Sequence, residues 1–304
     1  SEGTRSFQVK ATDEAGNTGS PAYHNWTIDL TDPVASISSG PDNPTNNQSA
    51  TFQFSSNEDD STFQCRIDSG SWANCTSPKS YGNLSEASHS FRVKATDEAG
   101  NTGSPDYHNW TIDLTPPTAY VTSGPDNPTN SQSAIFQFTS NDDDSTFECK
   151  MDSGSWSSCT SPKSYGGLSE DTHSFQVTAT DEAGNTGSPA YHNWTIDLTP
   201  PTATISSGPD NPTNSQTATF QFTSNEDDST FKCKLDTNGW FTCGSPKSYI
   251  DLSEGNHTFG VRATDEAGNT GSPAYYNWTI DLTDPVATIT SGPNDPTNNQ
   301  SATF

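Results

Sequence analysis

The sequence is poor in basic residues, in methionine and in long apolar runs. It has 12 lysines and arginines against 38 aspartates and glutamates, which gives its 304 residues a formal net charge of −26. Because proteins hold nucleic acids largely through lysine and arginine contacts to phosphates, this balance argues against a nucleic-acid partner. A membrane-spanning helix needs about 20 consecutive apolar residues, and every apolar run of this sequence is much shorter. We therefore expect no membrane insertion in this segment.

Cysteine, proline and glycine are well represented for so polar a chain. Six cysteines, 21 prolines and 22 glycines accompany a single methionine. This composition is typical of turn-rich extracellular proteins that fold in an oxidising compartment. The segment has no initiator methionine and no signal peptide, so we expect it to be a portion of a longer protein.

A repeat of 84 residues organises the whole chain. The undecapeptide ATDEAGNTGSP begins at Ala11, Ala95, Ala179 and Ala263. Repeats of this kind indicate an array of similar structural units. We predict three complete repeats and two partial ones, the C-terminal part of a repeat at 1–31 and the N-terminal part of another at 284–304. The complete repeats lie at 32–115, 116–199 and 200–283.

Apolar and polar residues alternate in short runs within each repeat. A period of two is typical of strands that have one face on a core and the other in water. Glycine, proline, asparagine and aspartate separate the runs and favour turns. With shorter strands near residues 119–122, 156 and 165–168, we predict an all-β fold: tandem immunoglobulin-like β-sandwich domains of about seven strands each, in a rod-like array. The clearest runs in the repeat 116–199 are 134–138, 147–151, 175–179 and 194–198.

Each complete repeat carries two cysteines that are ten residues apart. Each pair is symmetric about a turn residue, which is Gly70, Gly154 or Asn238. We therefore predict that the cysteines face each other across a hairpin and form a disulfide, with positive φ at the central residue. Zinc is the alternative, but two cysteines without a constant histidine do not supply four ligands. The pairs are Cys65 and Cys75, Cys149 and Cys159, and Cys233 and Cys243.

The last third of each repeat resembles a known family. Residues 168–198 contain LSE, HSFQVTATDEAGNTGS and YHNWTIDLTPP. This pattern is similar to the bacterial Ig-like repeats that occur in tandem in large secreted surface proteins and adhesins, although the cysteine pairs and the DLTPP or DLTDP junctions depart from it. The resemblance implies an extracellular location at the cell surface and further copies of the repeat in the same chain. It identifies no reaction.

The same resemblance implies a calcium site near each junction. Aspartate and asparagine supply the oxygen atoms that calcium prefers. The alternative, which we favour, is that DEAGN is only a tight turn, in which the aspartate caps the backbone and the glycine takes a positive φ. The candidate ligands are Asp13, Asn17 and Asp29; Asp97, Asn101 and Asp113; Asp181, Asn185 and Asp197; and Asp265, Asn269 and Asp281.

Two further groups of residues have a functional and a structural interpretation. The acidic runs 58–60, 142–144 and 226–228 either bind cations weakly or are solvated loops, and we favour the second. The aromatics Trp72, Trp156 and Trp240, with Tyr81, Tyr165 and Tyr249, form either a sugar-stacking platform or cover for the core. If exposed, they would make lateral contacts between chains.

The motif NWT occurs four times as a potential acceptor of N-linked glycans. The candidate asparagines are Asn25, Asn109, Asn193 and Asn277.

No nucleophile motif or phosphate-binding loop is present, so we do not expect an enzyme. We expect an extracellular structural protein that forms a semi-rigid rod or fibre for adhesion or scaffolding, with self-association into filaments. The alternative is a stalk or a glycan-binding array that carries a functional domain outside this segment and recognises a surface glycan or receptor.

Overall fold

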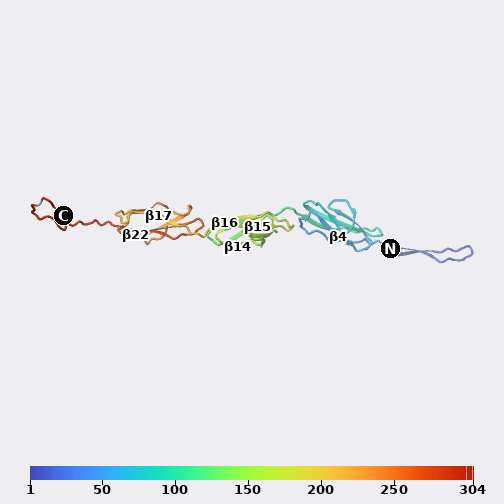
Figure 1. Ribbon diagram of the computed structural model, residues 1–304. Helices are drawn as coiled ribbons and strands as arrows, with labels where there is room; N and C mark the ends of the chain where they lie inside the picture. Colours follow the sequence, from blue (N-terminus) through green and yellow to red (C-terminus); the bar gives the residue numbers. More distant parts are fainter. Residues whose placement is uncertain (299, 303) are drawn as a thin grey trace. The chain divides into compact units, whose positions relative to one another are not determined.

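The protein is built from β-strands and turns (Figure 1). The computed structural model describes residues 1–298, 300–302 and 304, so the predicted partial repeat 284–304 includes two residues, 299 and 303, outside the described part. Within the described residues no helix has the length and apolarity that crossing a bilayer requires. The chain forms two compact units, of which the first contains Ser1–Ser123, Gln137–Lys163 and Phe175–His192, and the second contains Gly124–Phe136, Ser164–Ser174 and Asn193–Phe304.

The repeat 32–115 lies in the first unit and contains seven strands. They form a three-stranded antiparallel sheet, β3-β4-β7, and a four-stranded antiparallel sheet, β6-β5-β8-β9. Two antiparallel sheets of this size are the architecture of an immunoglobulin-like sandwich. The strands are β3 (Ala35–Ser39), β4 (Ala50–Ser56), β5 (Thr62–Ile67), β6 (Ala73–Cys75), β7 (Lys79–Tyr81), β8 (Ala87–Thr96) and β9 (Asp106–Ile112).

The repeat 200–283 lies in the second unit and has the same plan. Its sheets are β17-β18-β21 and β20-β19-β22-β23. The predicted all-β fold of immunoglobulin-like repeats is thus confirmed. The strands are β17 (Ala203–Ser207), β18 (Ala218–Ser224), β19 (Thr230–Leu235), β20 (Phe241–Cys243), β21 (Lys247–Tyr249), β22 (Gly255–Thr264) and β23 (Ala274–Ile280).

The middle repeat also has a three-stranded sheet, β10-β11-β14, and a four-stranded sheet, β13-β12-β15-β16. Its residues are divided between the two compact units. Its strands are β10 (Ala119–Ser123), β11 (Ser133–Ser140), β12 (Thr146–Met151), β13 (Ser157–Cys159), β14 (Lys163–Gly166), β15 (Asp171–Thr180) and β16 (Ala190–Ile196).

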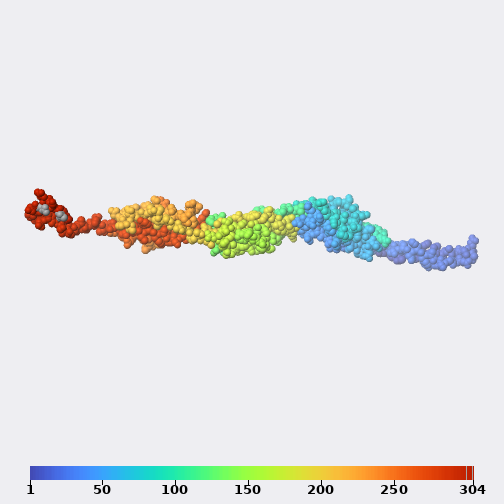
Figure 2. Space-filling model, in the orientation of Figure 1, coloured from blue at the N-terminus to red at the C-terminus, as the bar shows by residue number. Residues whose placement is uncertain are grey.

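The first 28 residues form only a two-stranded ribbon of β1 (Gly3–Val9) and β2 (Ala22–Ile28), in which Gly3 pairs with Ile28. Most side chains of this ribbon, the violet-blue segment in Figure 2, are exposed. Phe7 is accordingly 59% exposed, whereas its counterpart Phe91 in the complete repeat is fully buried.

The repeats 32–115 and 200–283, which each lie within one compact unit, have separate cores that are rich in aromatic side chains. In the repeat 32–115, Phe52 of β4 stacks on Phe91 of the facing sheet, with ring centroids 4.0 Å apart. Phe220 and Phe259 repeat this contact at 4.0 Å in the repeat 200–283. The buried side chains of the two repeats form separate clusters. Because the chain has few aliphatic residues, these aromatic side chains supply much of the apolar surface that is buried on folding.

Candidate functional site at the repeat junctions

The DEAGN sequence folds as a tight loop after the long strand of each sheet. The Asp97 carboxylate accepts hydrogen bonds from the backbone nitrogen of Asn101 at 2.7 Å and from its Nδ2 at 2.8 Å. Gly100 has a φ of 95°, which glycine adopts readily. Burial raises the pKa of Asp97, but the hydrogen bonds from Asn101, Gly100 and Ala99 outweigh it and lower the pKa overall. The structure therefore contains the predicted tight turn, with the aspartate as its cap and the glycine at positive φ.

The same loop also holds the linker that enters its own repeat. Nδ2 of Asn101 donates a hydrogen bond to the backbone oxygen of Asp29 at 3.1 Å. Nδ2 of Asn185 donates to the backbone oxygen of Asp113 at 2.9 Å, and Nδ2 of Asn269 donates to that of Asp197 at 2.8 Å. Each asparagine thus fixes the backbone of the preceding repeat where that repeat ends.

A glycine two residues after this asparagine lets the linker approach closely. A Cβ atom on Gly103 would lie 1.8 Å from the carbonyl oxygen of Pro33. The corresponding distance is 1.9 Å for Gly187 and Pro117, and 1.8 Å for Gly271 and Pro201. No side chain fits at such distances, so the NTG part of the motif is shaped by the linker rather than by the turn.

These contacts regroup the residues that the sequence predicts as candidate ligands. Asp29 lies with Asp97 and Asn101, whereas the sequence grouping places it with Asp13 and Asn17. By the same shift Asp113 lies beside Asn185, and Asp197 beside Asn269. The grouping within one repeat is wrong because the strand that ends at each aspartate leads out of its repeat and under the next DEAGN loop.

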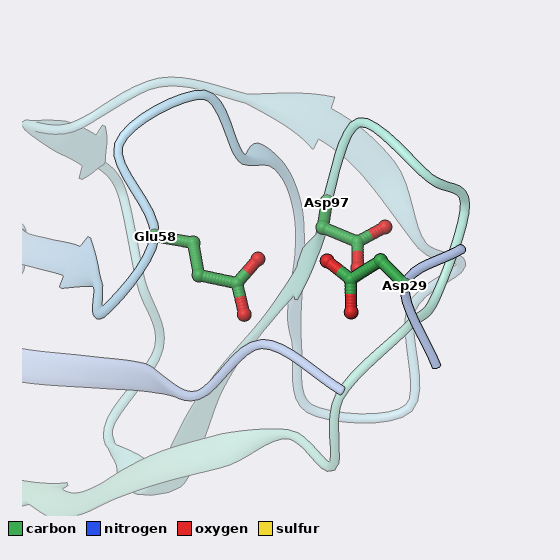
Figure 3. A group of neighbouring side chains, drawn as sticks. All are labelled: Asp29, Glu58 and Asp97. Atoms are coloured by element: carbon green, nitrogen blue, oxygen red, sulfur yellow. The ribbon is translucent and has the colours of Figure 1, made fainter. Parts of the chain in front are cut away.

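A third carboxylate completes an acidic group at two junctions. Oxygen atoms of Asp29, Glu58 and Asp97 all lie within 4.8 Å of one another (Figure 3). Asp197, Glu226 and Asp265 form the same arrangement. Burial raises the pKa of Glu58, and the negative charges of Asp97 and Asp29 raise it further; the pKa of Glu226 is raised in the same way. Three carboxylates this close are a donor set suited to a hard divalent cation.

The middle junction lacks this arrangement. Asp142 occupies the position of Glu58, and among the described residues no such group forms around it. Its side chain is one methylene shorter, and its Oδ1 accepts a hydrogen bond from the backbone nitrogen of Asp144 at 3.2 Å. The sequence favours solvated loops for Glu58 and Glu226, with weak cation binding as the alternative, and does not predict that they lie beside the aspartates of the junction. The glutamate at these two positions, against aspartate in the middle repeat, was the one available signal.

Other predicted ligands lie away from these groups. Asp13 and Asn17 are exposed, and the Asp13 carboxylate accepts hydrogen bonds from the backbone nitrogen and the side chain of Asn17. The hydrogen bond from the Asn17 side chain is the main cause of the lowered pKa of Asp13. Asp281 follows β23 and accepts a hydrogen bond from the backbone nitrogen of Thr283 at 3.0 Å. Among the described residues, none of these three belongs to a group of three carboxylates.

Replacing Gly187 by alanine should destabilise the junction with Pro117. The added methyl group has no room, and overpacking of this kind costs on the order of 1–3 kcal/mol. Gly19 is the matched control, because it occupies the same place in the motif but has only the backbone oxygen of Ala11 near it, at 3.8 Å. We expect calorimetry to give a lower melting temperature for Gly187→Ala and no change for Gly19→Ala. Equal effects of the two substitutions would contradict this account.

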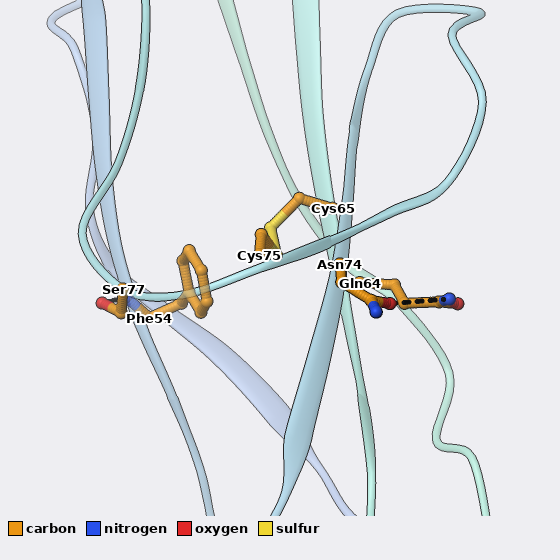
Figure 4. The surroundings of a disulfide bond; sticks show 6 residues. All are labelled: Phe54, Gln64, Cys65, Asn74, Cys75 and Ser77. Carbon is orange, nitrogen blue, oxygen red and sulfur yellow. Dashed lines mark hydrogen bonds between the residues drawn. A yellow bond between two sulfur atoms is a disulfide. The ribbon is translucent and has the colours of Figure 1, made fainter.

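The predicted disulfides are present in all three complete repeats, and Figure 4 shows the bond between Cys65 and Cys75. The Cα atoms of Cys65 and Cys75 are 5.8 Å apart. The predicted pairing geometry is wrong in one respect: Cys65 lies opposite Ala73, and Cys75 lies opposite Phe63, so the cysteines are diagonal neighbours on one face. Diagonal positions on one face of a hairpin are still within reach of each other.

Positive φ at the hairpin turn also falls on a different residue from the predicted one. Asp68 has a φ of 52°, and Asp152 and Asp236 match it, whereas Gly70, Gly154 and Asn238 do not have positive φ. Asp68 is held by the neighbouring strand: its Oδ1 accepts from the backbone nitrogen of Ser90 at 2.8 Å, and its Oδ2 lies 2.9 Å from Nδ1 of His89. Short polar side chains tolerate this conformation when such bonds are available.

The tyrosines of the predicted aromatic platform, which recur in each complete repeat, pack against the core. Tyr81, Tyr165 and Tyr249 pack edge-on against Phe52, Phe136 and Phe220. Burial raises the pKa of all three phenols. The tryptophans of the set, Trp72, Trp156 and Trp240, are half-buried. The structural interpretation therefore holds for the tyrosines.

The asparagines of the four NWT motifs are exposed on the second strand of the ribbon and on the outermost strands of the four-stranded sheets. They are Asn25, Asn109, Asn193 and Asn277. Their glycosylation stays a prediction.

Comparison with known proteins gives likenesses among solved structures alone. No protein-family model matches the chain, and no curated protein matches it. A tetra-tandem repeat from the extending region of a large adhesion protein is 20% identical, with a TM-score of 0.33 over 93% of this chain and 82% of that one. A 1.5-MDa bacterial ice-binding adhesin is 13% identical, with a TM-score of 0.42 over 84% and 100% of the two chains.

Fibronectin(III)-like modules of Clostridium thermocellum CbhA are 15% identical, with a TM-score of 0.36 over 57% of this chain and 100% of that one. These structures belong to the classes that the sequence resemblance names, tandem adhesin repeats and sandwich modules of the immunoglobulin type. At such identities and TM-scores we draw no functional conclusion from the likeness, and the fold assignment rests on the sheets themselves.

Proposed function

We propose that the chain is a structural segment of an extracellular adhesin-type surface protein, in which tandem repeats form a semi-rigid spacer. The observation that carries this proposal is the set of contacts between each DEAGN loop and the linker that enters its repeat. A hydrogen bond to the linker backbone and a glycine pressed against a linker proline restrict the motion of one repeat on the next. The disulfides support an oxidising location, since intracellular thiols are kept reduced.

We propose no catalytic role for the chain. The buried His89 and its partner Asp68 hold the hairpin turn against the neighbouring strand. Nε2 of His89 lies 2.9 Å from the backbone oxygen of Ser85, and its ring packs against that of Trp110. Burial lowers the pKa of His89, but its hydrogen bonds with Ser85 and Asp68 raise it overall. A histidine bound on both ring nitrogens has a structural task.

The alternative, an array that binds a neutral glycan by aromatic stacking, has less support. The tyrosines that would complete a platform are in the core. A stalk that carries a functional domain elsewhere in the protein agrees equally well with the spacer role.

We propose that calcium occupies the two groups of three carboxylates. Calcium takes 6–8 oxygen ligands, so backbone oxygens and water would complete its coordination. Because Asp29 comes from the preceding repeat and Asp97 and Glu58 from the next, a bound ion would tie the linker to the loops that already hold it. The like charges that raise the pKa of Glu58 would also be neutralised.

Calcium titration of the 304-residue chain tests this assignment. We expect isothermal calorimetry to give two tight sites and calcium to raise the melting temperature. Glu58→Gln with Glu226→Gln should remove both sites, whereas Asp142→Glu should add a third. Small-angle X-ray scattering should show a shorter and more flexible chain in EDTA. Identical melting and scattering in EDTA and in calcium would contradict the calcium proposal, while an extended chain in both would leave the spacer role intact.

A further inference from the structure

In two of the repeats, basic residues of this acidic chain gather on the outer face of the four-stranded sheet. In the four-stranded sheets the side chains that alternate with buried ones face outward, away from the three-stranded sheet. We call this surface, in the repeats 32–115 and 200–283, the cationic face. Its basic residues are Arg66, Arg92 and Lys94 in the first of these repeats and Lys232, Lys234 and Arg262 in the second, half of the 12 in the chain.

Aromatic rings hold several of these cations in place. The guanidinium carbon of Arg66 lies 4.8 Å from the ring centre of Trp72, and Nζ of Lys94 lies 4.9 Å from it. In the other repeat Arg262 lies 4.8 Å and Lys234 5.2 Å from the ring centre of Trp240. Such cation–π contacts orient the charge without neutralising it.

The two repeats reach this arrangement with exchanged residues. Arginine precedes lysine in the first repeat, at 66 and 94, and lysine precedes arginine in the second, at 234 and 262. The pair of cations over the tryptophan is thus kept although each position differs. The middle repeat has Lys150 and Thr178 at these places, and Glu148 beside them.

None of the six cations forms an ion pair with a carboxylate in the part of the chain that the structure describes. In the described residues the ion pairs involve histidine and aspartate, and none joins these lysines and arginines to a carboxylate. The Nε atoms of Arg66 and Arg262 are buried without a hydrogen-bond partner, which shows that the side chains are packed down on the sheet. Beside the cations, Tyr107 and Tyr275 are more than half exposed. Unpaired cations are unexpected in a chain that has 38 acidic residues.

We infer that the cationic face is a docking surface for a second copy of this chain, and that it receives the acidic loops of that copy. Those loops, at 58–60, 142–144 and 226–228, carry three consecutive carboxylates each, and Asp59, Asp60, Asp227 and Asp228 are exposed. Tryptophan, tyrosine and arginine are also the residues enriched where protein interfaces gain most of their affinity. The inference names the partner of the proposed spacer and rests on that role.

Repetition would strengthen such a contact. Arg66 and Lys234 are 168 residues apart in the sequence, and so are Asp59 and Asp227. Each copy therefore offers a positive face and a negative loop in both repeats, at the same interval along its sequence. Linked contacts of this kind raise the overall affinity well above that of one contact. Docking of a second copy would also explain why these cations form no ion pairs with the carboxylates of the described residues.

Sedimentation velocity of the whole chain tests the inference, in EDTA and at 0.15 M salt, where the screening length is about 8 Å. We expect concentration-dependent association of the native protein. Arg66→Glu with Lys234→Glu should weaken it at least tenfold, and so should Asp59→Lys with Asp227→Lys. An equimolar mixture of these two variants should associate again, because each supplies the surface that the other has lost. Lys79→Glu with Lys247→Glu is the control, since it makes the same change of charge on the other sheet.

Several results would overturn the inference. They are a native protein that stays monomeric, a control that weakens association as much as the face variant, and a mixture that does not recover. A monomer that binds polygalacturonate through Arg66 and Lys234 would assign the face to an acidic polysaccharide instead. Circular dichroism and melting curves of each variant show that its repeats are folded. The spacer role stands or falls separately, by the scattering and distance measurements on the single chain.

Discussion

Replacing Phe220 by alanine should destabilise the repeat 200–283 by about 3–5 kcal/mol, the usual cost of removing a fully buried phenylalanine. The ring centroid of Phe220 lies 4.0 Å from that of Phe259 and 5.2 Å from that of Trp278. Loss of the Phe220 ring therefore leaves a cavity between the two sheets. The core cluster of this repeat is separate from that of the repeat 32–115. We therefore expect calorimetry to show one transition moved to lower temperature and the transition of the repeat 32–115 unchanged.

Phe241→Ala is the matched control in the same repeat. Phe241 is 65% exposed, so its removal should change the unfolding free energy by no more than about 0.5 kcal/mol. If Phe220→Ala shifts the melting of every repeat by the same amount, the repeats do not have independent cores.

Removing one disulfide should cost about 2–3 kcal/mol in the repeat that loses it, because the bond closes a short loop in the unfolded chain. We expect this of Cys233→Ala with Cys243→Ala, since the two cysteines are ten residues apart. Chemical denaturation followed by circular dichroism measures the loss.

The same variant provides its own control in reducing buffer. A reductant should destabilise the native repeat to about the level of the variant, and it should not destabilise the variant repeat further. A variant as stable as the native protein in oxidising buffer would show that the bond contributes nothing to folding. Further destabilisation of the variant repeat by reductant would show that the bond acts through another part of the chain.

The strands and the core could be predicted from the sequence because they depend on local alternation. Phe52 and Phe54 are separated by one polar residue, and both point into the sandwich. The hairpin was placed correctly, but its positive φ was not. Asp68 adopts that conformation because Ser90 and His89, from another strand, hold its carboxylate. A contact between distant segments decides this detail, and no local pattern carries it.

The junction shows the same limit on a larger scale. The sequence predicts Asp97 and Asn101 as candidate ligands but groups them with Asp113, which follows them in the same repeat. Their actual partner, Asp29, lies 72 residues before Asn101. Because the repeats are nearly identical, the sequence offers the same residues for a contact within a repeat and for a contact across a junction. Only the path of the linker under the loop decides between them.

The central claim is that each DEAGN loop couples its repeat to the one before it, and distances between spin labels test it most directly. Labels carried by unnatural amino acids at the exposed positions Gln53 and Gln137 would report on the repeats 32–115 and 116–199 without disturbing the disulfides. Double electron–electron resonance on the native chain should give one narrow distance distribution, and Gly187→Ala should broaden it. A broad distribution in the native chain, unchanged by Gly187→Ala, would contradict the account.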